Sequence, residues 1–392
     1  MPAFKAPNRI LMGPGPSNIA PRVLEALSEP VIGHLDPEFS QLMERVKHLL
    51  RQTFLTENSL TMPVSAPGSA GMETCFVNLI EPSDKVLVCI NGVFGGRMLE
   101  NIERIGAEAV VLEQPWGEAV DPERVRKLLR EHSQICALAF VHAETSTGAL
   151  SDAQTLAGIA REYGAITIVD CVTSLAGVPL RTDDWGLDAV YSGTQKCLSC
   201  VPGISPVTFG PRALERLQRR TTKVPSWFLD LNLVMQYWDG GDGARTYHHT
   251  APVNALYALH EALVQLHEEG LERSWARHRH HHGALRSGLE ALGFEFAVSD
   301  ASARLPQLNA VRVPPGIEEA QVRSRLLSEF SLEIGPGLGP WAGEVWRIGL
   351  MGTSCTAESV LTFLSAYGEI SGAGDAGVRS AGEYYETAEG AD

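Results

Sequence analysis

The sequence predicts an α/β protein: a large domain with a mainly parallel central sheet and helices on both faces, followed by a smaller α+β domain. Between residues 60 and 210, short apolar runs alternate with segments of helical pattern, as is typical of parallel α/β sheets. The run 135–141 is apolar throughout, which indicates a central strand covered on both faces. From about residue 268 a helix, a strand, a helix and a strand follow one another, which indicates the second domain.

Changes in composition divide the chain into four predicted parts. They are an N-terminal arm (1–20), a large domain (21–267), a small C-terminal domain (268–368) and an acidic tail (369–392). Residues 13–16, Gly-Pro-Gly-Pro, cannot continue a helix or a strand, so the arm is expected to be extended and to lie against another part of the protein. The tail is rich in Gly, Ala and acidic residues, and we expect it to be disordered.

A turn of small residues follows the first strand of the large domain. Residues 60–64 have a strand pattern, 65–71 read Ser-Ala-Pro-Gly-Ser-Ala-Gly, and 72–79 have a helix pattern. Small side chains let backbone N–H groups approach an anion at the positive end of a helix, which favours a phosphate site. Such turns also occur without a ligand, and this one spells neither the dinucleotide fingerprint nor the P-loop.

Two further strands are followed by residues suited to ligand binding. After the strand 85–90 comes Phe94, an aromatic that can either stack on a flat ring or fill the core. After the strand 135–141 comes 142–148, a segment dense in hydroxyl groups. Because ligands of open α/β sheets bind at the carboxyl ends of the strands, both loops are expected at the site.

An acid and an amine follow two other strands. The strand 165–169 ends in Asp170, and the strand 188–191 leads through a tight turn to Lys196, 26 residues beyond Asp170, about one crossover. Pyridoxal phosphate (PLP) needs a lysine for its aldehyde and a carboxylate for its pyridinium nitrogen. The two residues therefore suggest PLP, and the alternative is that both are solvated strand ends.

Arg347 is the candidate for binding a substrate carboxylate. It lies in the predicted apolar strand 345–349, near the glycine-rich segment 335–339. A guanidinium there is costly unless it meets an anion, and arginine pairs bidentately with carboxylates. A structural salt bridge is the alternative.

Three clusters could suggest metal or redox chemistry. Adjacent histidines such as His248 and His249 rarely face one ion, and the histidines at 278–282 are expected on a solvated helix surface. Cys197 and Cys200 form a C-x-x-C motif without a second pair. We therefore expect no metal.

Composition limits the function classes and the compartment. The net charge of −15 opposes nucleic-acid binding. No apolar run reaches membrane-spanning length, and the first residues lack the form of a secretory signal. Seven scattered cysteines fit reduced thiols. We expect a cytoplasmic enzyme that binds neither nucleic acid nor membranes.

Several motifs in one order carry a resemblance to a known family. They are Gly13-Pro-Gly-Pro-Ser-Asn18, Ser192-Gly-Thr-Gln-Lys196, Tyr247-His-His-Thr250, Gly337-Leu-Gly-Pro340 and Arg347-Ile-Gly349. With these motifs the chain resembles the class V aminotransferases of PLP fold type I, and within them the alanine–glyoxylate and serine–pyruvate aminotransferase group. The resemblance runs from about residue 8 to about residue 368.

The resemblance implies pyridoxal 5′-phosphate as cofactor and a homodimer whose cofactor sites are shared across the interface. Lys196 would form the internal aldimine and move the proton, Asp170 would keep the ring nitrogen protonated, and Arg347 would clamp the substrate α-carboxylate. The further cofactor contacts implied in this way are Gly68, Ser69 and Gln195 at the phosphate, Phe94 on the ring, Thr145 near the ring hydroxyl, and Tyr247 and Thr250 from the partner subunit.

The implied reaction is a ping-pong transfer of the amino group of alanine or serine to glyoxylate or pyruvate. No second arginine is clearly placed for a side-chain carboxylate, which favours small donors over glutamate. Alternatives with the same fold are a ureidoglycine or aminophosphonate donor, or cysteine desulfuration, which needs a reactive cysteine; Cys355 is the only cysteine of the small domain. In a nucleotide-binding or non-catalytic scaffold protein, which is a further alternative, Lys196 and Asp170 would be coincidental.

Overall fold

The central sheet is the frame of the large domain. The computed structural model describes residues 1, 3–239 and 245–388, and in this part of the chain the sheet has seven strands. In spatial order they are β2 (Leu60–Val64), β10 (Ser205–Phe209), β9 (Ala189–Tyr191), β8 (Ile166–Asp170), β5 (Ile135–Val141), β3 (Lys85–Ile90) and β4 (Glu108–Glu113). β10 runs opposite to the other six strands, including its neighbours β2 and β9, so the predicted mainly parallel sheet is confirmed.

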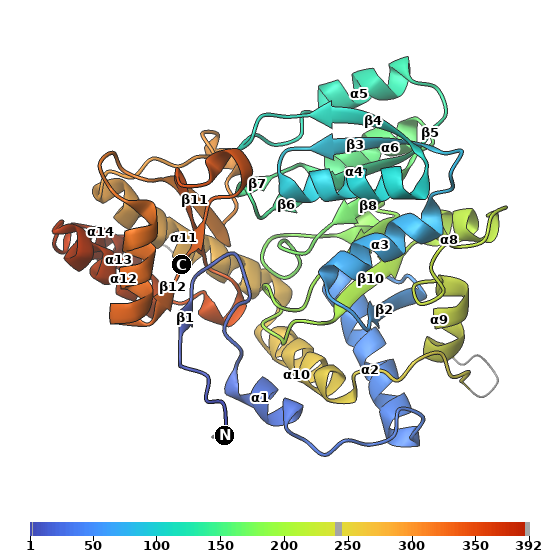
Figure 1. The fold of residues 1–392 in the computed structure, drawn as a ribbon, viewed down its shortest axis with the longest axis horizontal. Coiled ribbons are helices and arrows are strands. Elements are labelled where there is room, and N and C mark those ends of the chain that lie inside the picture. The colour runs from blue at the N-terminus through green and yellow to red at the C-terminus, as the bar shows by residue number, and fades with distance from the viewer. Residues whose placement is uncertain (2, 240–244, 389–392) are drawn as a thin grey trace.

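Helices cover both faces of the sheet, as predicted (Figure 1). They are α3 (Gly68–Leu79), α4 (Val93–Ile105), α5 (Pro122–Glu131), α6 (Ala153–Glu162), α7 (Thr182–Trp185), α8 (Pro211–Gln218) and α9 (Leu231–Trp238). α3 contacts α4, and α5 contacts α6. Crossover connections between parallel strands are right-handed. The connection through α4 leads from β3 to the edge strand β4, whereas the connection through α5 leads back from β4 to β5. The two pairs of helices therefore lie on opposite faces of the sheet.

Boundary residues explain where several of these helices begin. The carboxylate of Asp121 accepts from the N–H of Glu123 (2.8 Å) at the start of α5, and Asp152 caps α6 in the same way. α3 begins at Gly68, earlier than the predicted start at residue 72. The small residues read as a turn form the first turn of this helix, because tertiary packing overrides their weak helix propensity.

The N-terminal segment connects the two parts of the molecule. β1 (Ile10–Leu11) pairs in parallel with β12 (Leu332–Glu333) of the C-terminal part. Farther along, α1 (Pro21–Leu27) and α2 (Pro37–Phe54) pack against α10 (Val253–Glu269) of the large domain. Within the predicted arm itself, Ser17 Oγ donates to the carbonyl oxygen of Lys196 (2.7 Å), so the arm lies against both parts of the protein.

The C-terminal part is the predicted α+β arrangement. Its antiparallel sheet contains β11 (Leu308–Arg312), β14 (Val345–Gly349) and β13 (Gly335–Pro336). Its helices are α11 (Leu271–Ala291), α12 (Glu319–Phe330), α13 (Ala357–Ser371) and α14 (Ala376–Ala388). Most of the buried apolar side chains here form a cluster separate from that of the large domain, whereas a few, such as Leu308 and Met351, join the large domain's cluster. The predicted division after residue 267 falls in the last turn of α10 and remains a proposal.

The prediction of a disordered tail is wrong for Ala376–Ala388, which form α14. Ala381 is fully buried, Tyr384 and Tyr385 pack on the same cluster, and Ser380 Oγ lies 2.8 Å from Ser287 Oγ of α11. These contacts bury the few apolar side chains of the tail on one face, which composition alone does not reveal. The predicted disorder of residues 389–392 lies outside the described residues.

The histidines of α11 also differ from the prediction of a solvated surface. His278 is fully buried; its Nδ1 lies 2.7 Å from Ser274 O, and its Nε2 accepts from the N–H of Gly352 (3.0 Å). This imidazole therefore joins α11 to the loop before α13. Within the described residues, the helices lack the combination of length and apolar character needed to cross a bilayer.

Candidate active site

Asp170 and Lys196 meet at the carboxyl ends of adjacent strands, where the sequence predicts them. β8 ends at Asp170 and lies beside β9 in parallel, with Asp170 opposite Tyr191. Lys196 follows β9 after a short turn. The two side chains thus face the same edge of the sheet, at the position where ligands bind in open α/β folds.

Asp170 is a buried carboxyl with two hydrogen-bond donors. Its Oδ1 accepts from the N–H of Val172 (2.8 Å), and its Oδ2 accepts from the hydroxyl of Tyr191 (2.9 Å). Burial raises the pKa of Asp170 to about 7, although both hydrogen bonds act to lower it. A cationic partner, such as a protonated ring nitrogen, would favour the carboxylate. Tyr191 was not identified from the sequence, because only the strand pairing brings it to Asp170.

Lys196 is buried beneath the N-terminal arm. Its Nζ donates to the carbonyl oxygen of Pro14, and Ser17 Oγ donates to its backbone carbonyl (2.7 Å). Gly15 has a φ of +103°, and a Cβ there would lie 2.5 Å from Lys196 Nζ, so glycine is required both for its backbone and for its size. Burial, followed by the positive charge of Arg347, lowers the pKa of Lys196 to about 8. A neutral, nucleophilic amine is therefore accessible near neutral pH.

The first turn of α3 provides an anion site beside these residues. Its first N–H groups lack acceptors within the helix, and the positive end of the helix dipole faces the same way. Gly68 is buried, and a Cβ there would lie 3.3 Å from Cγ2 of Val172. Val172 is two residues beyond Asp170, so Gly68 lies close to the end of β8. Ser69 is exposed. Gln195 Oε1 is buried without a hydrogen-bond partner, as expected of an amide side chain placed for a polar ligand.

Phe94 and Glu144 lie together at the neighbouring strand ends. Phe94 is half-buried in the first turn of α4, and its N–H donates to Glu144 Oε2 (3.1 Å). Glu144 is fully buried in β6 (Ala143–Glu144), which pairs with β7 (Ala149–Leu150). Glu144 is not among the residues predicted from the sequence, although a carboxylate within the hydroxyl-rich segment 142–148 was a usable signal.

Arg347 brings the small domain to this site. It is only 5% exposed, its Nε donates to Pro336 O (2.8 Å), and its Nη1 donates to Thr145 O of the large domain (3.1 Å). Burial lowers the pKa of Arg347 to about 10, and the negative charge of Glu144 opposes this shift. Backbone carbonyls hold the guanidinium, and within the described part of the chain no carboxylate forms a salt bridge with it, so it can bind an external carboxylate. Thr145 is buried, and its hydroxyl bonds the hydroxyl of Thr173.

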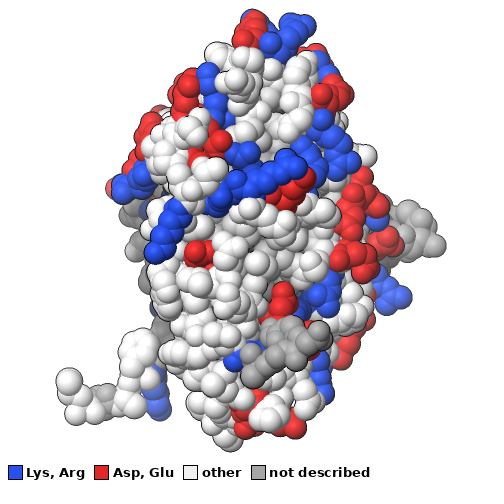
Figure 2. Space-filling model, turned by 90° about the vertical axis from the view of Figure 1, so that its right-hand side faces the viewer, with Lys and Arg blue, Asp and Glu red and all other residues white. Residues whose placement is uncertain are grey.

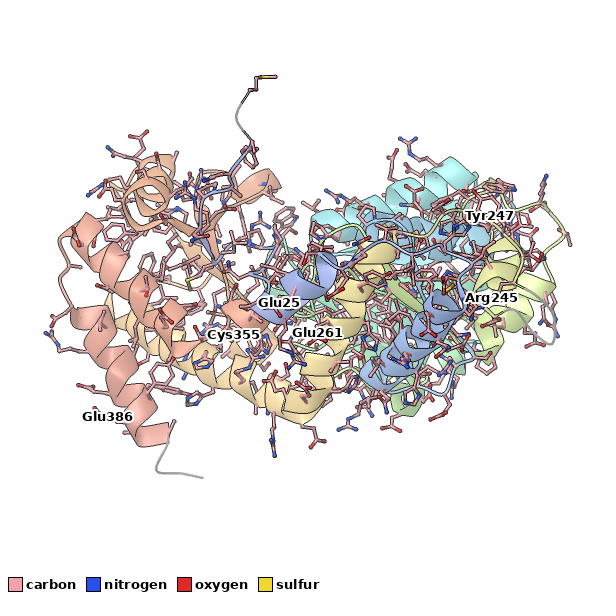
Figure 3. All side chains as sticks on the ribbon, turned by 90° about the horizontal axis from the view of Figure 1, so that it is seen from below. Glu25, Arg245, Tyr247, Glu261, Cys355 and Glu386 are labelled. Carbon is pink, nitrogen blue, oxygen red and sulfur yellow. The ribbon has the colours of Figure 1, made fainter. Side chains whose placement is uncertain are left out.

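Tyr247 and Thr250 are separated from this group. Both are exposed, and Tyr247 contacts the ring of His34 (5.2 Å between centroids). Figure 3 shows Tyr247 at the end of the molecule opposite Glu386. The same motif nevertheless reaches the turn before α3, because His249 Nε2 lies 2.7 Å from Ser65 Oγ.

Comparison with known proteins identifies the family. The chain matches the Aminotransferase class-V family over residues 10–337. The chain belongs to the class-V aminotransferases. It is 41% identical over 353 residues to an alanine–glyoxylate aminotransferase of Rattus norvegicus, covering 90% of this chain and 85% of the relative.

Solved structures agree with the class-V assignment. An alanine–glyoxylate aminotransferase from Nostoc sp. has a TM-score of 0.91 at 45% identity, covering 94% of this chain and 97% of that chain. A ureidoglycine–glyoxylate aminotransferase from Bacillus subtilis has a TM-score of 0.94 at 36% identity, covering 98% of this chain and 99% of that chain. The predicted fold, transaminase class and PLP dependence are therefore confirmed.

The residues of this class-V site fit PLP. Lys196 offers a buried amine of lowered pKa, Asp170 a buried carboxyl for the ring nitrogen, and the first turn of α3 an anion cradle. The unpartnered Gln195 amide adds a polar group at the cradle. This set matches what the cofactor needs from a protein.

Proposed function

We propose that the protein transfers the amino group of alanine or serine to glyoxylate or pyruvate by a ping-pong mechanism. The observation that carries the proposal is the convergence of Lys196, Asp170 and Arg347 at one buried edge of the sheet. Among the described residues, Arg347 is the only arginine that is fully buried. A single buried guanidinium suits substrates with one carboxylate, whereas a second carboxylate would need a second cation.

The cofactor, when bound, supplies an aldehyde and an electron-withdrawing ring. Lys196 is proposed to hold the cofactor and then, as a free amine, to move a proton from the substrate Cα. Asp170 stabilises a proton on the ring nitrogen, and Arg347 orients donor and acceptor by their shared α-carboxylate. One site thus holds the two substrates in turn, which is why the reaction is ping-pong.

The other proposed cofactor contacts are argued from their positions. Gly68, Ser69 and Gln195 surround the anion cradle, and Thr145 and Phe94 lie at neighbouring strand ends. The phosphate is proposed to take N–H donors from the first turn of α3. Phe94 is proposed to stack on the ring, since it lies in the first turn of α4, at the strand ends that also carry Asp170.

A homodimer is proposed because the side chains of Tyr247 and Thr250 are exposed, as expected of residues that contact a partner subunit. The side of the molecule that carries α8 and α9 presents a broad area with few charges (Figure 2). Several large apolar side chains of the large domain are exposed, namely Leu24, Val31, Leu35, Trp227 and Tyr247. Exposed apolar surface of this kind marks protein interfaces. All seven cysteines are free thiols, which supports the proposed cytoplasmic location.

A ureidoglycine donor is the second candidate, because the structure from Bacillus subtilis named for that activity covers nearly the whole chain. No comparable observation favours an aminophosphonate. Desulfuration is disfavoured because Cys355 is buried and burial raises its pKa to about 12. Cys355 lies just before α13 (Figure 3). A desulfurase needs an accessible thiolate, which this buried thiol does not provide.

The half-reaction with single donors tests the proposal. PLP-loaded protein is mixed separately with alanine, serine, glutamate and ureidoglycine, and conversion of the cofactor to pyridoxamine phosphate is followed by absorbance. Fast conversion by alanine or serine, reversed by glyoxylate, is expected. Conversion by ureidoglycine alone would replace the donor, and conversion by none would contradict the proposal.

A further inference from the structure

Glu144 is a fully buried carboxylate that the reaction described above does not use. Its Oε1 accepts from the N–H and the hydroxyl of Ser146 (3.0 and 2.6 Å), and its Oε2 accepts from the N–H of Phe94 (3.1 Å). Ser146 Oγ in turn accepts from the N–H of Val93 (2.9 Å). Residues 144–146 therefore provide the acceptors for the first turn of α4, which carries Phe94.

The contact between these segments is close and leaves little freedom. A Cβ on Gly92, just before α4, would lie 2.4 Å from both Glu144 Cγ and Ser146 Oγ. Glycine at this position lets β6 and the start of α4 approach until the carboxylate reaches the helix N–H groups. The backbone at Val93 and Phe94 is thus held by the side chains of Ser146 and Glu144, which follow a neighbouring strand.

Both side-chain oxygens of Glu144 must be hydrogen-bond acceptors, because each of them faces a backbone N–H group. An ionised carboxylate is an acceptor only, whereas a glutamine amide has one oxygen and one NH₂ group. In Glu144→Gln the NH₂ group would face either the N–H of Phe94 or the N–H of Ser146. A buried N–H would then lose its acceptor, which is unfavourable.

Among the described residues, the ionised form of Glu144 is the negative charge that opposes the loss of the proton from Arg347, although burial raises the pKa of Glu144 itself. Its charge likewise acts on Asp170. Arg347 and Asp170, which are proposed to contact the substrate carboxylate and the ring nitrogen, therefore both lie within the electric field of Glu144. This agrees with a role at the site in addition to capping a helix.

We infer that Glu144 is a positioning residue, whose carboxylate fixes the first turn of α4, directly at the N–H of Phe94 and indirectly through Ser146, and so holds the Phe94 ring against the cofactor. The inference rests on the proposed function, because it assumes that Phe94 stacks on PLP. Glu144 itself need not touch cofactor or substrate. Its effect passes through the backbone of Phe94.

The test compares PLP-loaded wild type, Glu144→Gln and a matched control. Asp188→Asn is that control, because Asp188 is also buried and accepts from a backbone N–H, that of Thr167 (2.9 Å). Asp188 lies just before β9, whereas Lys196 and the site lie beyond the other end of that strand. Visible circular dichroism per bound cofactor reports how firmly the ring is held. The dissociation constant of PLP and the melting temperature are measured on the same samples.

The inference predicts that Glu144→Gln lowers the visible circular dichroism at least twofold and raises the dissociation constant of PLP roughly tenfold, as loss of one buried hydrogen bond would. Asp188→Asn should lower the melting temperature and leave both cofactor signals unchanged. In a Phe94→Leu background, Glu144→Gln should have a much smaller effect on PLP binding, because residues that act through one another are not additive.

Two results would overturn the inference, and they are distinguishable. If wild type binds PLP normally but Glu144→Gln changes only the melting temperature, as Asp188→Asn does, Glu144 is a structural residue. If the effects of Glu144→Gln and Phe94→Leu on PLP binding simply add, Glu144 does not act through Phe94. A wild-type protein without a PLP band would instead overturn the proposed function.

Discussion

At the residue scale, the site combines groups whose environments move their pKa values toward neutrality. Burial raises the pKa of Asp170 to about 7 and lowers that of Lys196 to about 8. Proton-transfer groups work best when their pKa values lie near the working pH. The low dielectric at this edge of the sheet therefore prepares the amine before any substrate arrives.

The lowered pKa of Lys196 predicts how cofactor-free protein captures PLP. Only the neutral amine attacks an aldehyde, so the rate of capture should rise between pH 7 and 9, with a midpoint near 8, and not near the ordinary lysine value. Stopped-flow absorbance at saturating PLP measures it. Asp170→Asn is the control for titration of the neighbouring carboxyl. A midpoint above pH 10 would show that Lys196 is not held in this environment.

Arg347 is expected to determine affinity for carboxylates. Arg347→Ala should raise the apparent KM for alanine and glyoxylate roughly a hundredfold, as loss of two charged hydrogen bonds implies. Arg347→Lys should recover little, since an ammonium cannot pair bidentately. Steady-state kinetics with each substrate decide the matter. Unchanged apparent affinity for both would assign the carboxylate to another residue.

The site residues illustrate what the sequence could and could not provide. Asp170 and Lys196 were predictable because each directly follows an apolar run, and parallel strands bring their carboxyl ends together. Tyr191 and Pro14 were not, because their contacts with these residues depend on strand register and on the path of the arm. That Asp170, Lys196 and the other proposed contacts, such as Thr145 and Ser69, hold the cofactor stays a prediction.

At the element scale, α14 is the clearest departure from the sequence prediction. Composition suggested disorder, yet Val378, Ala381 and Tyr384 recur at intervals of three residues, a helical period that could have been read. The predicted start of α3 was wrong for a different reason. The glycines of its first turn have weak helix propensity, and only packing makes that turn helical. Strands were easier, because β2 and β3 are short apolar runs bounded by polar or turn residues.

The docking of α14 predicts a stability effect in the tail. Ala381→Asp places a charge in a fully buried position and should lower the free energy of unfolding by about 2–4 kcal/mol. Glu386, which is exposed (Figure 3), provides the control, since Glu386→Ala should change little. Urea denaturation of PLP-loaded protein measures both. Equal stability of the two variants would mean that the tail is not packed.

At the scale of the whole molecule, the arm and Arg347 join the small domain to the lysine-bearing edge of the large one. Met12 O accepts from the N–H of Gly349 (2.6 Å), and Ser17 bonds the carbonyl of Lys196. A change in the position of the small domain relative to the large domain would therefore move both Lys196 and Arg347, the residue proposed to bind the substrate carboxylate. This long-range connection could not be read from the sequence, where the arm shows only that it is extended.

The proposed sharing of sites between subunits predicts complementation. Lys196→Ala and Tyr247→Ala/Thr250→Ala should each have little activity alone. In a mixed dimer, one site combines a normal Lys196 with a normal Tyr247 and Thr250, so random mixing after unfolding and refolding should restore about a quarter of the wild-type activity. Activity of the mixture equal to the average of the two variants would show that the subunits do not share sites.

Lys196, Asp170 and Arg347 are proposed to form a site that moves an amino group between small acids. The most direct measurement is nitrogen transfer: the protein, PLP, glyoxylate and alanine labelled with nitrogen-15 are incubated, and the products are analysed by mass spectrometry. Labelled glycine and unlabelled pyruvate are predicted, both absent with Lys196→Ala. Labelled ammonia in place of labelled glycine, or equal transfer by Lys196→Ala, would contradict the claim.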